Sequence, residues 1–364
     1  MSGATFPLFL AGLVLLILGA ELLVRGASRL ASALGIAPLI IGLTVVAFGT
    51  GSPELAIAVH STFTGQVDIA VGNVIGSNIF NILFILGLSA LITPLVVAHQ
   101  LVRFDVPIMI AASALVLMMA ADGAIAVLDG WVLFAGIVVY TWVLLRLGWR
   151  RTERDAGPAP AETGTRRTKW LTHLALIALG LVLLVFGSRW LVTGAIQIAR
   201  AFQVSELVIA LTIVAAGTSL PEVATSIVAG VRGQRDIAVG NVVGSNLYNL
   251  LMVLGFAAIV SGDGLAVPAG ARHFDLPVML AASIACLPIF LSYHRVSRWE
   301  GGLFFGYWAA YTAYVFLLAA RHDALGPFSS VMSLFVIPLT VITLAVSAWR
   351  ASRQRARQRA RQQE

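Results

Sequence analysis

Two glutamates lie in segments that are otherwise apolar enough to cross a membrane, Glu54 in GTGSPEL and Glu222 in GTSLPEV. An ionised carboxylate at the centre of a bilayer costs roughly 2.5 kcal/mol or more, so such a residue indicates a functional site. Pro53 and Pro221 precede them, and each proline removes a backbone donor and frees carbonyl oxygens of the preceding turn. The carbonyls concerned are those around Ala47, Thr50, Ala215 and Thr218. Each carboxylate is therefore expected in an oxygen-rich site.

The next apolar segment of each half carries two amides and a hydroxyl, spaced four residues apart. A step of four residues turns a helix by only about 40°, so each trio forms one polar stripe. The trios are Asn73, Ser77 and Asn81, and Asn241, Ser245 and Asn249. Carboxylate, carbonyl, hydroxyl and amide oxygens are the ligands that Ca²⁺ and Na⁺ prefer, whereas Zn²⁺ and Cu⁺ prefer nitrogen and sulfur.

The charge of the two glutamates narrows the chemistry further. Together they supply two negative charges, which one Ca²⁺ neutralises or which two or more Na⁺ or H⁺ neutralise in its place. A site that must be neutral to be stable in lipid, and that accepts either set of ions, predicts an antiporter.

The elements that position these residues are membrane helices. Of the 364 residues, 59% are apolar and only 11% are charged, far from the balance of a soluble domain. About 20 apolar residues span the hydrocarbon core, and we count eleven such runs, the first of which we interpret as a retained helix. They cover residues 5–25, 37–61, 68–92, 104–121, 125–147, 170–193, 205–230, 236–261, 274–293, 301–320 and 327–349.

The basic residues predict the orientation of the chain. The net charge of +7 is concentrated in the Pro- and Ala-containing segment 150–169 and in the Arg-rich tail 350–362. In a membrane protein such clusters indicate cytoplasmic loops rather than nucleic-acid binding. With the N-terminus outside and the C-terminus in the cytoplasm, all but four of the 24 basic residues lie inside. The four exceptions are Arg189, Arg200, Arg272 and Arg321.

An internal duplication organises the chain. Residues 49–83 align without gaps to residues 217–251, and similarity extends outward to five predicted helices in each half. Because five is odd, the second half enters the membrane in the opposite orientation, which predicts inverted-topology repeats, a transporter architecture. We expect an all-α membrane protein with a first repeat (1–148), a mobile cytoplasmic linker (149–169), a second repeat (170–320), and an eleventh helix with a cytoplasmic tail (321–364).

The paired motifs resemble a known family. GTGSPEL with GNVIGSNIFN, and GTSLPEV with GNVVGSNLYN, are similar to the two α-repeats of the sodium/calcium exchanger family within the cation/Ca²⁺ exchanger superfamily. The resemblance covers residues 8–320 in arrangement and is dense over 42–90 and 210–258. It implies a five-plus-five inverted-repeat fold that moves Ca²⁺ out of the cytoplasm in exchange for Na⁺, usually three per Ca²⁺, by alternating access.

The resemblance also implies roles for single residues. The central Ca²⁺ ligands correspond to Glu54 and Glu222 and the carbonyls of Thr50 and Thr218, with Asn81 and Asn249 completing the set. The flanking Na⁺ ligands correspond to Ala47, Ala215, Ser77, Ser245 and Ser219.

This sequence departs from the family pattern at two positions. Gly51 stands where many members have Ser, so one flanking Na⁺ site loses a hydroxyl. A water or Ser52 is a candidate substitute for it, and the three-Na⁺ stoichiometry implied by the resemblance stays open. Asn249 stands where K⁺-dependent relatives have Asp, which argues against K⁺ co-transport. Gly51 leaves Ca²⁺/H⁺ exchange on the same fold as the alternative function; a passive cation channel and a non-transporting membrane scaffold are the other classes.

No enzymatic activity, cofactor or obligatory protein partner is expected, and the substrates are the ions themselves. Lacking a large regulatory loop and a targeting segment, the chain fits a prokaryotic inner membrane. We predict a structural role at helix ends for the duplicated acids Asp105 and Asp275. We predict close helix packing at two glycine pairs, Gly72 with Gly76 and Gly240 with Gly244. Cys286 is predicted to be a packed thiol.

Overall fold

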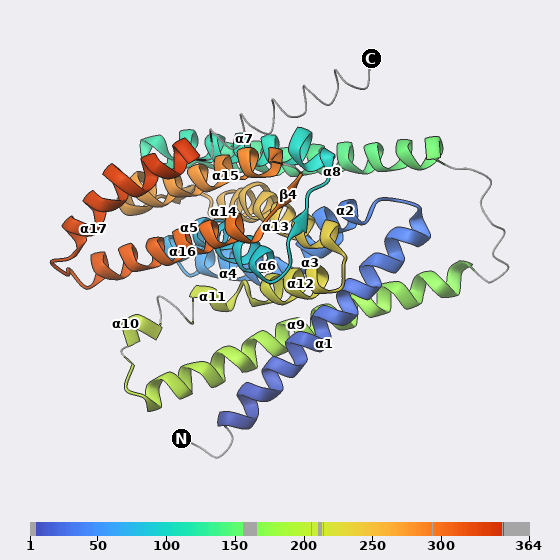
Figure 1. Cartoon of the computed structure of the whole chain (residues 1–364), viewed down its shortest axis with the longest axis horizontal. Helices are drawn as coiled ribbons and strands as arrows, with labels where there is room; N and C mark the ends of the chain where they lie inside the picture. The colour runs from blue at the N-terminus through green and yellow to red at the C-terminus, as the bar shows by residue number, and fades with distance from the viewer. Residues whose placement is uncertain are drawn as a thin grey trace.

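The computed structural model describes residues 5–155, 166–204, 206–209, 213, 215–292, 294–343 and 345. Almost all of these residues are helical, as the sequence predicts (Figure 1). The centre of the predicted linker and the Arg-rich tail lie outside the described residues.

The first repeat contains helices interrupted by short π-helical segments (η) and two short strands. In order they are α1 (Thr5–Leu34), α2 (Pro38–Ile41), η1 (Gly42–Val46), α3 (Ala47–Thr50), α4 (Ser52–Phe63), α5 (Val67–Phe80), η2 (Asn81–Leu86), α6 (Gly87–Ile92), β1 (Leu95–Val96), η3 (Leu101–Asp105), α7 (Val106–Met119), the 3₁₀ turn η4 (Ala120–Asp122), β2 (Ala124–Ile125) and α8 (Val127–Asp155).

The second repeat follows the same order, and a further helix comes after it. Its elements are α9 (Arg166–Ala201), α10 (Glu206–Ile209), α11 (Ala215–Gly217), α12 (Leu220–Val231), α13 (Arg235–Leu247), η6 (Tyr248–Val253), α14 (Leu254–Val260), β3 (Leu265–Ala266), η7 (Ala271–Asp275), α15 (Leu276–Leu291), β4 (Arg295–Val296) and α16 (Arg298–Ala319). The additional helix begins with α17 (Leu325–Val331) and η8 (Met332–Val336).

Within the described residues, nine helical segments are long and apolar enough to cross a membrane. A tenth span is the pair Pro38–Thr50 and Ser52–Phe63, which bends by 43° at its break. The predicted span 205–230 includes residues outside the described part, and its described pieces are α10, α11 and α12. The additional C-terminal helix runs from Leu325 to Thr343 as a span-length segment. These helices confirm the all-α membrane fold with two five-helix repeats of inverted topology and an eleventh helix.

Two small antiparallel sheets join the repeats. β1 pairs with β4, with Leu95 opposite Val296, and β2 pairs with β3, with Ala124 opposite Ala266. β1 and β3 occupy equivalent positions in the two repeats, as do β2 and β4, so each sheet is the symmetry counterpart of the other. If the chain crosses the membrane once per span, β1 and β4 lie on one side and β2 and β3 on the other. The pairing therefore agrees with opposite orientations of the repeats.

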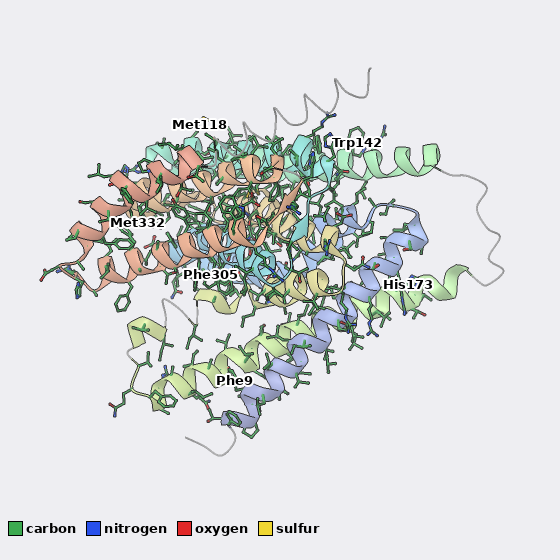
Figure 2. All side chains as sticks on the ribbon, in the orientation of Figure 1. Phe9, Met118, Trp142, His173, Phe305 and Met332 are labelled. Atoms are coloured by element: carbon green, nitrogen blue, oxygen red, sulfur yellow. The ribbon has the colours of Figure 1, made fainter. Side chains whose placement is uncertain are left out.

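α1 and α9 cross at close range because glycines face each other along both helices (Figure 1). A Cβ atom on Gly19 would lie 2.8 Å from the Gly180 carbonyl oxygen, and one on Gly187 would lie 3.0 Å from the Gly12 carbonyl oxygen. Near the end of the contact the backbone of Phe9 lies against Gly194 (Figure 2). Only small residues permit backbones to approach this closely in a membrane.

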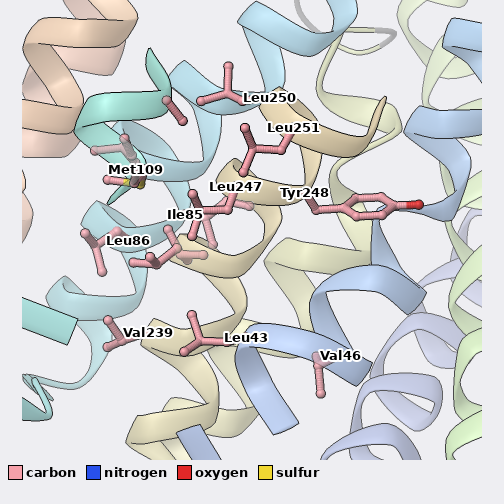
Figure 3. Packing of buried hydrophobic residues seen from close by; sticks show 14 of the residues in the cluster. Leu43, Val46, Ile85, Leu86, Met109, Val239, Leu247, Tyr248, Leu250 and Leu251 are labelled. Carbon is pink, nitrogen blue, oxygen red and sulfur yellow. The ribbon is translucent and has the colours of Figure 1, made fainter. Parts of the chain in front are cut away.

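The most buried spans are the two that carry the polar stripes. In an 18-residue stretch of Val67–Ile92, 67% of the residues are buried, and in Arg235–Val260 the share is 83%, against 39% or less in the other seven unbroken spans. Large apolar side chains such as Leu43, Ile85 and Leu247 fill the space around them (Figure 3). The stripes are thus held at the centre of the protein, away from lipid.

Gly240 and Gly244 confirm their predicted packing role. A Cβ on Gly244 would lie 2.8 Å from Leu43 Cα, and one on Gly240 would lie 3.0 Å from the Leu39 carbonyl oxygen. For Gly72 and Gly76, no described atom lies within 4 Å of the added Cβ. Cys286 is buried, as expected of a packed thiol.

Asp105 and Asp275 differ from their predicted position at helix ends. Each is the last residue of a π-helical segment that continues directly into α7 or α15. Tyr140 donates to Asp105 at 3.0 Å and Tyr311 donates to Asp275 at 2.8 Å, so each acid links its helix to the next one of the same repeat.

Candidate functional site

The two predicted glutamates occupy equivalent positions just after a helix break. Glu54 lies in the first turn of α4 and Glu222 in the first turn of α12. At the breaks, Gly51 has φ −79° and ψ 2°, and Ser219 has φ −89° and ψ 8°, both outside the helical region. Pro53 and Pro221 fit the first turn of a helix, where a backbone N–H has no helical partner. Both carboxylates are buried, with 1% and 2% of the residue exposed.

A hydroxyl group of the second repeat holds the Glu54 carboxylate. Ser219 Oγ donates to Glu54 Oε1 at 3.1 Å and lies 3.3 Å from Ser77 Oγ. Glu54 Oε2 is buried and has no hydrogen-bond partner among the residues that the structure describes. One oxygen of the carboxylate is thus held in place while the other faces the interior unpaired.

The environment of Glu222 comes from both repeats. Thr50 Oγ1 donates to the Val46 carbonyl at 3.1 Å and lies 3.3 Å from Asn241 Oδ1 of the second repeat. Asn241 Nδ2 donates to Ser226 Oγ at 3.0 Å and to the Glu222 carbonyl at 3.4 Å. Glu222 Oε2 is also buried, and no described residue forms a hydrogen bond with it. Ser219, which bonds to Glu54, lies only three residues before Glu222, so both acids belong to one site.

Further predicted ligands present unpaired oxygens in the same region. Among the predicted ligands, the buried oxygen atoms without a hydrogen-bond partner in the described part of the chain are Glu54 Oε2, Glu222 Oε2, Asn81 Oδ1, Asn249 Oδ1 and Ser245 Oγ. Three further buried oxygens, Asn78 Oδ1, Ser89 Oγ and Thr225 Oγ1, belong to residues that are not predicted ligands and are also unpaired there. Buried polar atoms are normally paired because desolvation without a partner is costly, so a cluster of unpaired acceptors needs a ligand. A hard cation such as Ca²⁺ is a suitable ligand, because it contacts several oxygen atoms at once.

The backbone ligands implied by the resemblance lie at the breaks. Ala47 begins α3 and is buried, and its carbonyl accepts the Gly51 N–H at 3.0 Å, which leaves one lone pair free for an ion. Ala215 begins α11, and its side chain lies outside the described part. Thr218 directly precedes the break of the second repeat, and its side-chain oxygen Oγ1 lies 3.5 Å from Asn73 Oδ1.

The space beside Gly51 is filled by an aromatic ring. A Cβ on Gly51 would lie 2.8 Å from Cδ1 and 2.9 Å from Cε1 of Tyr248. The Tyr248 side chain extends away from Leu247, Leu250 and Leu251 (Figure 3) and its ring packs against Phe48 at 4.5 Å between centroids. The hydroxyl missing at position 51 is therefore replaced by ring carbons.

Ser52 does not fill the vacancy left by the missing hydroxyl at position 51. Its side chain is exposed, and its Oγ donates to the Phe48 carbonyl at 2.9 Å within its own helix. Of the two replacements considered for that hydroxyl, the Ser52 side chain is thereby excluded in this conformation.

Three residues near the site were not singled out by the sequence. Ser226 forms a hydrogen bond with Asn241. Asn78 and Asn246, which directly follow the stripe serines Ser77 and Ser245, are fully buried. The duplication contains a signal for the last two, because each follows the stripe serine in both copies of GSN. Ser226 has no such signal, since Ala58 stands at its place in the first repeat.

Comparison with known proteins identifies the family to which the chain belongs. The sequence profile of the family described as "Sodium/calcium exchanger protein" matches residues 5–146 and 172–317. CaxA of Alkalimonas amylolytica is 38% identical over 85% of this chain and 97% of its own length, and the inner membrane protein YrbG of Escherichia coli is 38% identical over 76% and 86%. A solved structure of the sodium-calcium exchanger NCX_Mj, soaked with Na⁺ and Sr²⁺, has a TM-score of 0.74 and 30% identity, covering 86% of this chain and 99% of its own. With two matched segments that together span most of its length, this chain belongs to the sodium/calcium exchanger protein family.

Proposed function

We propose that this member of a cation/Ca²⁺ exchanger family is a Na⁺/Ca²⁺ antiporter whose substrates bind between Glu54 and Glu222. The observation that carries the proposal is the cluster of buried, unpaired oxygens, two of which belong to these carboxylates. Two carboxylates with neutral oxygen ligands suit Ca²⁺, and their charge of −2 balances one Ca²⁺. The soak of NCX_Mj with Sr²⁺, another alkaline-earth ion, supports this choice.

In this proposal the central Ca²⁺ is bound by both glutamates and by the carbonyls of Thr50 and Thr218. The amide oxygens of Asn81 and Asn249 complete the central site. The Na⁺ ions that replace Ca²⁺ use Ala47, Ala215, Ser77, Ser245 and Ser219 in addition. The bonds between Ser219, Ser77 and Glu54 support one such flanking site, because the three oxygens lie within 3.3 Å of their neighbours.

Exchange follows from the energetic cost of leaving the two carboxylates without a bound cation. With Ca²⁺ or Na⁺ bound, the two carboxylates are neutralised and the site is stable in the low-dielectric interior. Without ions, two negative charges remain buried within Coulombic range of each other. The repeats can then reorient readily only in the loaded states, which couples the outward movement of one ion to the inward movement of the other. No bond is made or broken and no cofactor takes part.

Ca²⁺/H⁺ exchange is the second candidate, and Gly51 favours it. The ring of Tyr248 fills the space where a serine hydroxyl would contribute to a second flanking Na⁺ site. Protons need no such ligand, because they neutralise Glu54 and Glu222 directly.

We further propose a prokaryotic inner membrane as the location, with the N-terminus outside and the C-terminus in the cytoplasm. The distribution of arginines supports this orientation, and the name of the relative YrbG, an inner membrane protein, supports the membrane.

We divide the chain into repeats 1–148 and 170–320, the cytoplasmic linker 149–169 and the appended segment 321–364. The two separately matched segments of the family profile support that division. No nucleic-acid or obligatory protein partner is part of the proposal.

Ca²⁺ flux into proteoliposomes tests the proposal. An imposed Na⁺ gradient is expected to drive Ca²⁺ uptake, and Glu54→Gln and Glu222→Gln are each expected to reduce it to the level of empty liposomes. Glu21→Gln is the matched control, because Glu21 lies outside the site at an exposed ion pair.

The same liposomes separate the competing functions. Uptake driven by a pH gradient and insensitive to Na⁺ identifies the Ca²⁺/H⁺ antiporter. Uptake that needs no counter-ion identifies a channel, and no uptake by any variant identifies a scaffold. Flux that survives Glu54→Gln contradicts the assignment of the site.

A further inference from the structure

Asn246 lies one position beyond the second polar stripe, in α13, and is fully buried. Its side chain joins three parts of the protein. Asn246 Nδ2 lies 3.4 Å from the Asn78 carbonyl oxygen and 3.7 Å from Met109 Sδ, while Asn246 Oδ1 accepts from Asn81 Nδ2 at 3.0 Å. α5, α7 and η2 therefore meet at this one amide.

The partners of Asn246 allow only one orientation of its amide. A backbone carbonyl and a thioether can accept hydrogen bonds but cannot donate them. If the amide were turned round, Oδ1 would face these two acceptors and Nδ2 would face Asn81. The orientation with Nδ2 toward Asn78 and Met109 is thus fixed by atoms whose roles cannot change, and Oδ1 must face Asn81.

The orientation of the Asn246 amide determines the orientation of the Asn81 amide. Because Asn246 Oδ1 is an acceptor, Asn81 must donate to it through Nδ2. Asn81 Oδ1 must then point away from Asn246. Asn81 Oδ1 is one of the buried, unpaired oxygens of the site. An amide free to turn would present its NH₂ group to the site for part of the time, and an NH₂ group repels a cation.

We infer that Asn246 is a positioning residue, which fixes the Asn81 amide so that its oxygen, rather than its NH₂ group, faces the transported cation. The inference rests on the proposed function, in which Asn81 is a cation ligand. It adds to that function a residue that touches no ion and yet sets the affinity for ions. Hydrogen-bond partners of metal ligands act in this way, and their loss typically costs about 10–100-fold in affinity.

The first repeat supplies a natural control. Asn78 is the equivalent of Asn246, is equally buried, and carries the same side chain. Its Nδ2, however, donates to the Val74 carbonyl of its own helix at 2.7 Å, and its Oδ1 has no partner among the described residues. Asn78 therefore orients no ligand through its side chain in this conformation.

The experiment measures the apparent Kd for Ca²⁺ from the rise in melting temperature of the purified full chain as Ca²⁺ is added. Asn246→Leu keeps the number and branching of the side-chain heavy atoms but removes both hydrogen-bonding groups, and it is expected to raise the Kd by about tenfold or more. Asn78→Leu is expected to lower thermal stability as much but to leave the Kd within about threefold. In transport, Asn246→Leu should raise KM for Ca²⁺ while kcat changes little.

A double-mutant cycle separates orientation from general damage to the fold. Both oxygens of a carboxylate accept, so in an Asn81→Asp background no amide remains to be oriented. There Asn246→Leu is expected to leave the Kd unchanged or to lower it. An equal rise of Kd in both backgrounds, or an equal rise in Asn78→Leu, overturns the inference.

The two hypotheses fail separately. If the wild-type protein shows no Ca²⁺-dependent stabilisation, the proposed function is contradicted. If the wild type binds Ca²⁺, Glu54→Gln abolishes binding and Asn246→Leu does not alter it, only the positioning role of Asn246 is contradicted.

Discussion

At the scale of single residues, Gly51 and Tyr248 make the two sides of the ion site unequal. Their equivalents in the other repeat are Ser219 and Phe80. Ser219 contributes a hydroxyl to the Glu54 side, whereas Gly51 contributes none to the Glu222 side and leaves room for a ring. The site therefore keeps the central acids of both repeats but only one of the two break-position hydroxyls.

Gly51→Ser tests how tightly the ring fills this space. The new side chain would start 2.8 Å from a ring carbon, so we expect a loss of about 1–3 kcal/mol in stability, seen as a lower melting temperature. Gly306→Ser is the control, because Gly306 is exposed on α16 and has no described atom within 4 Å of an added Cβ. Tyr248→Leu should rescue most of the loss. An unchanged melting temperature in Gly51→Ser would show that the ring moves freely.

The sequence predicts the central residues of the site because they are duplicated. Glu54 and Glu222 stand out as acids in apolar runs, and a spacing of four residues predicts the stripes. The role of Asn246 was not predictable, because its partners Asn81 and Met109 come from the other repeat. Nor does the spacing of residues reveal that the Ser52 side chain points away from the site, because the side chains of neighbouring helix residues point in directions about 100° apart.

At the scale of elements, the crossing of α1 and α9 depends on glycines that recur every seven residues in both helices. Gly12, Gly19 and Gly26 of α1 correspond to Gly180, Gly187 and Gly194 of α9. Every one of them would bring an added Cβ within 3.0 Å of an atom of the partner helix. At most of these positions the glycine lies directly against backbone atoms of the other helix.

Gly19→Ile is expected to force the two helices apart. Its Cβ would lie 2.8 Å from backbone atoms of Gly180 and Leu184, and a helix backbone cannot move aside as a flexible side chain can. We expect a loss of about 3 kcal/mol or more and a melting temperature below that of Gly306→Ile, in which the same side chain faces open space. Equal melting temperatures would show that α1 and α9 tolerate a wider separation.

The ion pairs of Glu21 should contribute little to stability. Glu21 bonds to Arg25 within α1 and to Arg232 Nε at 2.8 Å in the turn that follows α12. Both arginine side chains are more than half exposed, and such pairs are typically worth less than about 1 kcal/mol. Glu21→Gln is therefore expected to leave the melting temperature nearly unchanged. A fall as large as that of Gly19→Ile would indicate a larger role in joining α1 to the second repeat.

Hydropathy predicts the existence of the helices better than their interruptions. The break at Gly51 was predictable from Pro53. The π-helical segments η2 and η6 contain no proline or glycine from which they could be predicted. They begin at Asn81 and Tyr248, where partners from other helices decide the local winding. α8 and α9 also extend into the predicted linker, to Asp155 and from Arg166, because charged residues can continue a helix beyond the bilayer.

At the scale of the whole molecule, the two strand pairs make the predicted topology testable with the single cysteine of the chain. Cys286→Ser removes the only thiol, which is buried. In that background, Asp263→Cys, next to β3, should react in intact cells with a membrane-impermeant maleimide, whereas Arg295→Cys in β4 should react only after the membrane is opened. Both side chains are exposed, so access depends on the side of the membrane. The reverse pattern of labelling would invert the proposed orientation.

The sharing of partners between the repeats has a consequence for biosynthesis. The first repeat leaves the ribosome and enters the membrane before Ser219, Thr218 and Asn246 have been made. Glu54 and Asn81 must therefore wait in the bilayer without the groups that will hold them. The polar site can form only when the second repeat inserts in the opposite orientation and docks. Correct insertion of the second half thus decides whether the acid of the first half is buried safely, and a chain halted between the repeats exposes an unpaired carboxylate to the quality control of its membrane.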